Sequence, residues 1–159
     1  MNTEADLKTA LELLAVAPSA VAQPEPNRCD VRLEPGDLVA AAAKLQAAHW
    51  GYLSAITGLD HGPASGELEA LYHFCHGAAV LTLRVRLPRQ GAALPSLCDL
   101  TAIAGPLERE LSEMFGININ GSPDRNRLYL PDEWPPELYP LRKDAPLADL
   151  EKDPKGLAN

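Results

Sequence analysis

The sequence has few aromatic residues and few cysteines. Aromatic residues make up 5% of the 159 residues, and the three cysteines are Cys29, Cys75 and Cys98. They are odd in number, widely scattered and contain no CxxC pair, so they support neither a disulfide framework nor a zinc ribbon. An iron–sulfur cluster needs about four thiolates. We therefore expect this chain to hold no cluster of its own.

Long apolar runs and a positive charge balance are also missing. No apolar stretch approaches the roughly 20 residues that span a bilayer, and the first residues, MNTEAD, lack the basic start of a signal peptide. The chain has 14 Lys and Arg against 22 Asp and Glu, a formal net charge of -8. A nucleic-acid-binding face requires basic residues. These absences predict a soluble, cytosolic chain that does not bind nucleic acid.

Hydrophobic patterning predicts an α+β fold. The expected elements are a helix at 3–16, a proline-rich linker at 17–27, a strand at 29–34, a helix at 35–50, strands at 52–60, 67–74 and 79–87, a connection at 88–105 and a helix at 106–115. Consecutive strands with short turns favour an antiparallel meander. We expect a small, mostly antiparallel sheet of about four strands, with the helices packed on one face.

The segment from Ile117 onward has a different composition. Seven of the 15 prolines fall there, which excludes a helix and a central strand. Apolar residues such as Tyr129 and Trp134 are nevertheless spaced along it, which is unusual for a solvated disordered tail. We predict an extended proline-rich tail that lies along a surface, and three parts: an N-terminal helix and linker at 1–27, a core domain at 28–116, and a partner-binding tail at 117–159.

The stretch PLERELSEMFG, residues 106–116, carries the punctuation of one short charged helix. Pro106 suits a first turn and Gly116 suits a left-handed C-cap. Glu108 and Glu110 point about 200° apart on a helix, so they cannot act together as an acid–base pair. Arg109 and Glu113 are spaced to form an i,i+4 ion pair. The charges are consistent with a salt-bridged face or with a charged seam that holds the tail and a partner in register.

Catalytic and metal-binding motifs are weak. The cluster of His73, Cys75 and His76 lacks a clear third and fourth metal ligand, with His61 as one candidate, and ordinary strand and turn residues are the preferred interpretation. No nucleophile elbow, Walker A or dinucleotide-binding fingerprint is present. One alternative function remains open, a small stand-alone acidic enzyme that uses Glu110 or His61.

Four segments together resemble a known family. ERE (108–110), MFGI (114–117), SPDRNRLYLPDEW (122–134) and PLRKD (140–144), in this order and spacing, look like the thirty-kilodalton subunit of respiratory complex I, the C subunit of the bacterial NADH–quinone oxidoreductase. The same module occurs in energy-converting, membrane-bound [NiFe] hydrogenases. WPPELYPLRKD is somewhat closer to the hydrogenase branch, so both branches stay open.

The resemblance implies a non-redox structural subunit without catalytic, cofactor or metal residues of its own. It would pack in the peripheral arm, on the cytoplasmic side of the membrane, against a large hydrogenase-like subunit (the forty-nine-kilodalton type) and an iron–sulfur small subunit. NAD(H), quinone and iron–sulfur clusters, or a NiFe centre, would be held by those partners. Carried over as structural and interface positions are Glu108, Arg109, Glu110, Phe115, Gly116, Pro123, Asp124, Arg127, Pro140, Leu141, Arg142, Lys143 and Asp144.

Overall fold

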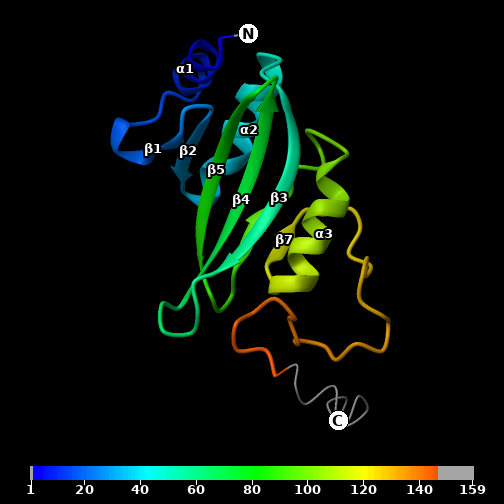
Figure 1. The fold of residues 1–159 in the computed structure, drawn as a ribbon. Helices are drawn as coiled ribbons and strands as arrows, with labels where there is room; N and C mark the ends of the chain where they lie inside the picture. The colour runs from blue at the N-terminus through cyan, green and yellow to red at the C-terminus, as the bar shows by residue number, and fades with distance from the viewer. Residues whose placement is uncertain (1, 147–159) are drawn as a thin grey trace.

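A computed structural model describes residues 2–146 of the chain. Its elements in order are α1 (Thr3–Leu14), the 3-10 turn η1 (Pro18–Ala20), β1 (Val21–Glu25), β2 (Arg28–Leu33), the 3-10 turn η2 (Pro35–Asp37), α2 (Leu38–Ala47), β3 (Tyr52–Asp60), β4 (Glu67–His76), β5 (Ala79–Pro88), β6 (Ala93–Pro95), α3 (Ala104–Phe115) and β7 (Asn118–Asn120). Figure 1 shows the long β3–β4–β5 meander with α3 beside it and the orange segment that ends at residue 146 below.

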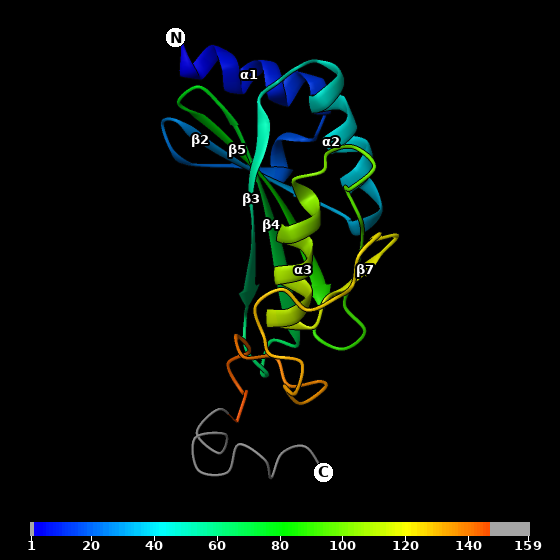
Figure 2. The ribbon, with the colours of Figure 1, turned by 90° about the vertical axis from the view of Figure 1, so that its right-hand side faces the viewer.

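The predicted α+β class is confirmed. The main sheet has five strands in the order β1-β2-β5-β4-β3, one more than expected. β3–β4–β5 is the predicted antiparallel meander, and Figure 2 shows α2 and α3 on the same side of it. β2 pairs parallel to β5, because α2, β3 and β4 intervene before the chain returns beside β2.

The interpretation of residues 17–27 as a linker is wrong. Pro18–Ala20 form a 3-10 turn, and Val21–Glu25 form an edge strand that pairs antiparallel with β2. Pro24 lacks an N–H group, which an edge strand can tolerate because its outer side needs no ladder hydrogen bond. The resulting β1–β2 hairpin runs across the boundary that we predicted at residue 27.

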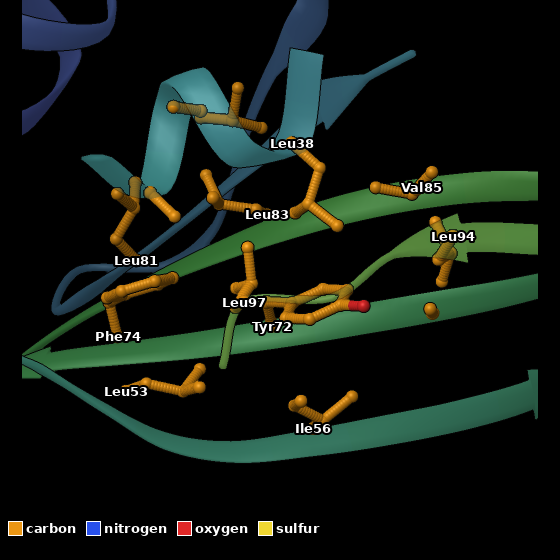
Figure 3. Packing of buried hydrophobic residues seen from close by; sticks show 14 of the residues in the cluster. Leu38, Leu53, Ile56, Tyr72, Phe74, Leu81, Leu83, Val85, Leu94 and Leu97 are labelled. Atoms are coloured by element: carbon orange, nitrogen blue, oxygen red, sulfur yellow. The ribbon is translucent and has the colours of Figure 1, made fainter. Parts of the chain in front are cut away.

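The hydrophobic core lies between the helices and one face of the sheet. Leu81, Leu83 and Val85 of β5 are fully buried, as their alternation predicts. Tyr72 and Phe74 of β4 point into the same layer (Figure 3). Helix α1 contributes to this cluster through Leu7, Ala10 and Leu14, and α2 through Leu38, Ala41, Ala42 and Leu45. The N-terminal helix is therefore part of the same core as the sheet.

The other face of the sheet is polar and carries a network of ion pairs. Arg84 donates two hydrogen bonds of 2.8 Å to Glu69 and one of 3.0 Å to Asp30. Glu69 is 1% exposed. Burial acts to raise the pKa of its carboxyl, but the hydrogen bonds from Arg84 and His61 outweigh burial and hold that pKa below its ordinary value. The charged side chains on this face thus find their hydrogen-bond and ion-pair partners on neighbouring strands of the same sheet.

The ends of the three helices agree only in part with the local sequence signals. Asn2 caps α1 by accepting the Ala5 N–H at 3.3 Å, one residue before the start that we predicted at Thr3. Helix α2 is shorter than the predicted 35–50, because Pro35–Asp37 form a 3-10 turn and the chain leaves the helix before His49, whose φ is 52°. The left-handed cap of α3 at Gly116, with φ 68°, is confirmed.

A second, two-stranded parallel sheet was not predicted. It consists of β6, within the expected connection 88–105, and β7, at the start of the expected tail. The two strands flank α3 in the sequence, so they hold the ends of the segment that contains it. Leu94, Ile117 and Ile119 from this region are buried in the core. The part of the tail up to Asn120 thus belongs to the folded domain.

Candidate docking surface around helix α3

Glu108 lies inside the domain and does not face a partner. It is 0% exposed, and its carboxylate accepts hydrogen bonds from the Leu97 N–H at 2.6 Å and from the Ser96 hydroxyl at 2.7 Å. The Cys98 thiol lies 3.4 Å away. Burial, together with this carboxylate, raises the pKa of the thiol, which keeps it protonated. The prediction that Glu108 belongs to a charged seam between the tail and a partner is therefore wrong, because its carboxyl group binds the loop before α3.

The predicted ion pair between Arg109 and Glu113 does not form, because both side chains bind the segment that follows β7. Arg109 donates to the backbone carbonyls of Asn126 and Arg127 at 2.9 and 2.8 Å, and pairs with Asp124 at 3.0 Å. The Glu113 carboxylate accepts the backbone N–H groups of Leu128 and Tyr129 at 2.6 and 3.0 Å. One face of α3 thus binds backbone and side chains of residues 124–129.

Arg127, another motif residue, closes the loop that follows. Its guanidinium donates to the carbonyls of Pro131 and Trp134 at 3.2 and 2.7 Å. The Trp134 indole in turn donates to the Leu138 carbonyl at 2.8 Å, and Pro135 is buried. The prolines and the arginine therefore shape an irregular loop without regular secondary structure. Pro123, at the start of this segment, is exposed.

The PLRKD segment, residues 140–144, binds the C-terminal end of α3. The Leu141 N–H donates to the Met114 carbonyl at 3.2 Å, and Arg142 Nε donates to the Phe115 carbonyl at 2.8 Å. The last carbonyls of a helix lack partners within the helix, and a positive side chain there is favoured by the helix dipole. The segment therefore completes the helix end, and the orange part of the chain below α3 in Figure 1 follows this path.

A buried carboxylate anchors the other side of the segment. Asp60, at the end of β3, is 3% exposed; it accepts the N–H groups of Lys143 and Gly62, each at 2.7 Å, and pairs with Arg89. Arg89 also pairs with Asp144. Burial acts to raise the pKa of Asp60, but the hydrogen bonds from Lys143, Arg89 and Gly62 outweigh it and hold that pKa below its ordinary value.

Two close approaches fix the end of α3, one against the tail and one against β3. A Cβ atom on Gly116 would lie 2.4 Å from ring atoms of Tyr139, and a Cβ atom on Gly58 would lie 2.2 Å from the Phe115 ring. Tyr139 also stacks under the Arg142 guanidinium, 4.6 Å from ring centroid to Cζ. The MFGI and PLRKD segments are therefore in direct contact, with Phe115 packed on the sheet and Gly116 beneath Tyr139.

Some motif positions remain directed to solvent. Tyr129 and Leu141 are 64% and 55% exposed, and Lys143 is exposed as well. Pro140 is partly buried. Glu110 is partly buried and forms no ion pair or hydrogen bond with the other residues in the range 2–146. These are the positions at which α3 and the following segment have side chains without an assigned partner.

The alternative of an acid–base enzyme gains no support from the geometry. His61 Nε2 lies 2.9 Å from Glu69 Oε2, and no contact joins His61 to Glu110 in the described part of the chain. His61 is thus paired with a buried carboxylate of the sheet. His73 sits between the hydroxyls of Thr57 and Thr82, each at 3.1 Å. Within residues 2–146 no group of three or more His, Cys, Asp or Glu side chains is placed to hold a metal ion.

Sequence reasoning missed the Asp60–Arg89 pair, which holds the PLRKD segment. The one local signal was Asp60-His61-Gly62, in which an aspartate followed two residues later by glycine suits an Asx turn, and Asp60 does accept the Gly62 N–H. Nothing in the sequence connects Asp60 with Arg89 or with residues 143–144.

Among the helices of the described residues, none is long and apolar enough to span a bilayer.

Comparison with known proteins places these features in a family. A family model described as "Respiratory-chain NADH dehydrogenase, 30 Kd subunit" matches residues 31–151. The NADH-quinone oxidoreductase C subunit of Roseiflexus sp. (strain RS-1) is 32% identical over 154 residues, covering 92% of this chain and 87% of that protein. Formate hydrogenlyase subunit 5 of Escherichia coli (strain K12) is 37% identical over 98 residues, covering 60% of this chain.

The chain spans only 17% of the length of formate hydrogenlyase subunit 5, and 38% of the NADH-quinone oxidoreductase C subunit of Chloroherpeton thalassium. A chain from the structure of a membrane-bound sulfane sulfur reductase, an archaeal respiratory membrane complex, matches with a TM-score of 0.75 and 24% identity, covering 97% of this chain and 92% of that one. That likeness shows a shared fold. The family match covers most of the chain, including strands β3 to β5, α3 and the PLRKD segment, and the chain belongs to the family described as the 30 Kd subunit of the respiratory-chain NADH dehydrogenase.

Proposed function

We propose that the chain is a non-redox structural subunit of the peripheral arm of a proton-translocating NADH–quinone oxidoreductase. In this role it docks the large hydrogenase-like subunit of the quinone module and supports electron transfer from NADH to quinone. NAD(H), quinone and the iron–sulfur clusters belong to partner subunits, among them the iron–sulfur small subunit. The chain reaches the cytoplasmic side of the membrane through the complex.

One observation carries the proposal. The motif segments 108–110, 114–117, 122–134 and 140–144 are separated in the sequence, but they are joined into one ordered surface around α3. Glu113 and Arg109 bind residues 124–129, and the end of α3 binds residues 141 and 142. A domain that needed a tail only for its own stability would bury its apolar side chains, whereas Tyr129 and Leu141 stay exposed. An ordered surface with exposed apolar side chains supports a docking role.

Co-purification tests the proposal. A tag on this chain, expressed from its own genome, is expected to recover the large hydrogenase-like subunit and the iron–sulfur small subunit from detergent-solubilised membranes in near-equal amounts. The matched control is a strain that carries the same tag on an unrelated cytosolic protein. A tagged chain that is abundant and folded but recovers neither subunit would refute the proposal.

The hydrogenase branch is a second candidate, favoured by the match to formate hydrogenlyase subunit 5 and by 42% identity over 64 residues with membrane-bound hydrogenase subunit beta of Pyrococcus furiosus, which covers 40% of this chain. In that case the chain is the equivalent subunit of an energy-converting [NiFe] hydrogenase. The co-purified large subunit decides between the two, since paired CxxC ligands for nickel in its sequence identify the hydrogenase.

A further inference from the structure

The side chains of the PLRKD segment fall into two sets. Arg142 and Asp144 are bound by the chain's own domain, to the Phe115 carbonyl and to Arg89 respectively. Leu141 and Lys143 contribute only their backbone N–H groups, to the Met114 carbonyl and to Asp60. The Leu141 side chain is 55% exposed. The Lys143 side chain is exposed and forms no ion pair with the other residues in the range 2–146.

We propose that Leu141 and Lys143 are the residues of this segment that recognise the partner, and that the matching partner surface is an apolar pocket beside a carboxylate. This inference rests on the proposed docking function and sharpens it. In this proposal Arg142 and Asp144 hold the segment in place, since both are bound by the domain, although the Asp144 side chain is 50% exposed. The two classes of residue alternate along the segment, so a single backbone conformation serves both purposes.

Pre-organisation explains why a single exposed leucine is informative here, although exposed apolar residues are common on protein surfaces. The backbone of Leu141 is fixed by its hydrogen bond to the last turn of α3, and that of Lys143 by Asp60, which is 3% exposed. A side chain on a fixed backbone loses less conformational entropy when it binds. Tyr129 has the same character, since its N–H is bound by Glu113 of α3 while its side chain is 64% exposed.

Charge complementarity defines the second half of the partner surface. The whole chain has a formal net charge of -8, so a partner that is negative overall would be repelled at long range. A single carboxylate beside an apolar pocket avoids this, because it pairs with Lys143 at short range. Such a contact at an interface rim is weakened by salt.

The test uses substitutions that leave every anchoring hydrogen bond in place. L141E and K143E retain the backbone N–H groups of residues 141 and 143, so the melting temperature of the full chain is expected to stay within about 2 °C of wild type. The affinity for the purified large hydrogenase-like subunit, measured by titration, is expected to fall at least about tenfold for each variant. For K143E the loss is expected to shrink as salt rises. The control is I103E, because Ile103 is 50% exposed at the opposite end of α3; its affinity and stability are expected to remain those of wild type.

The outcomes separate the two proposals. If the wild-type chain binds the large subunit and L141E and K143E bind it with the same affinity, this inference is overturned and the docking function stands. Absence of wild-type binding overturns the docking function itself and the inference with it. A fall in melting temperature of L141A comparable to that of R142Q also overturns the inference, because Leu141 would then hold the segment to the domain. If I103E loses as much affinity as L141E, the inference is also overturned, because the effect at position 141 would then not differ from that at a distant exposed position.

Discussion

Replacement of Asp60 by asparagine removes the charge that holds the PLRKD segment while keeping the size of the side chain. In the wild type one carboxylate oxygen accepts the Gly62 N–H and the Arg89 guanidinium, and the other accepts the Lys143 N–H. Asparagine has only one acceptor oxygen. With that oxygen toward Gly62 and Arg89, its NH₂ group faces the Lys143 N–H, and two donors oppose each other. With the amide turned round, the NH₂ group faces the Gly62 and Arg89 donors instead, so D60N weakens the anchor in either orientation.

The magnitude follows from burial. The side chain of Asp60 is 2% exposed and that of Arg89 is 10% exposed, and breaking a buried ion pair by removing one partner costs about 3–5 kcal/mol. Arg89 keeps its pair with Asp144, and the amide keeps some of the hydrogen bonds, so the expected loss in free energy of unfolding is about 2–3 kcal/mol. The control E67Q removes the ion pair between Glu67 and Arg86, whose side chains are 40% and 47% exposed. Exposed pairs contribute less than about 1 kcal/mol.

Two assays check the reasoning on full-length protein. Urea unfolding gives the free energies of D60N, E67Q and wild type. Limited trypsin digestion with mass spectrometry gives the cleavage rate after Arg142 and Lys143, which lie in the anchored segment. Cleavage needs local opening, so D60N is expected to be cut there faster than E67Q. A D60N variant no less stable than E67Q, or cleaved at the same rate, would refute the assignment of Asp60 as the anchor.

Three further predictions concern the same surface. Folding lowers the pKa of Asp60 below its ordinary value of 3.8, so the stabilisation that Asp60 provides is fully present above about pH 4 and is lost as pH falls through the folded-state value. The opening equilibrium of the Lys143 amide, measured by hydrogen exchange, should therefore rise only in acid. A rise between pH 5 and 8 would contradict this. G116A is expected to lose about 2 kcal/mol or more in free energy of unfolding, since it combines left-handed backbone strain with a clash against Tyr139. The control G121A, at φ 82° with open space around it, has only the backbone strain. Equal losses of the two variants in thermal unfolding would contradict the packing of Gly116 against Tyr139. E113Q leaves one acceptor for the N–H groups of Leu128 and Tyr129 and should lose about 1–2 kcal/mol with faster exchange of those two amides, while E110Q should change neither quantity.

The sequence was most informative where a signal is local. Alternation on β5 predicted which side chains are buried, because Leu81 and Leu83 lie on one face and Arg84 on the other. Gly116 predicted the end of α3 correctly, and Pro106 predicted its start to within two residues, since the helix begins at Ala104. β3 was predicted at its observed bounds, 52–60.

Features that depend on distant residues could not be predicted. The parallel pairing of β2 with β5 depends on the path of the chain through α2 and the meander, and hydrophobic patterns do not encode it. Glu108 was predicted to lie on a salt-bridged face or a charged seam, but it is buried, and the loop at 96–98 supplies its hydrogen bonds. β1 was hidden by Pro24, which sits on an edge strand.

The charged groups of α3 and the PLRKD segment do not meet directly, although both carry charges that could have paired. Arg109 and Glu113 bind backbone groups of residues 126–129, and Arg142 binds the backbone of Phe115. Backbone groups are present whatever the neighbouring side chains are. These contacts therefore fix the path of the chain without restricting which side chains face solvent. Side-chain pairing anchors the segment through Asp60, Arg89 and Asp144. Since Arg142 and Asp144 bind groups of the chain's own domain, the proposed contact of this segment with a partner falls to the exposed side chains of Leu141 and Lys143.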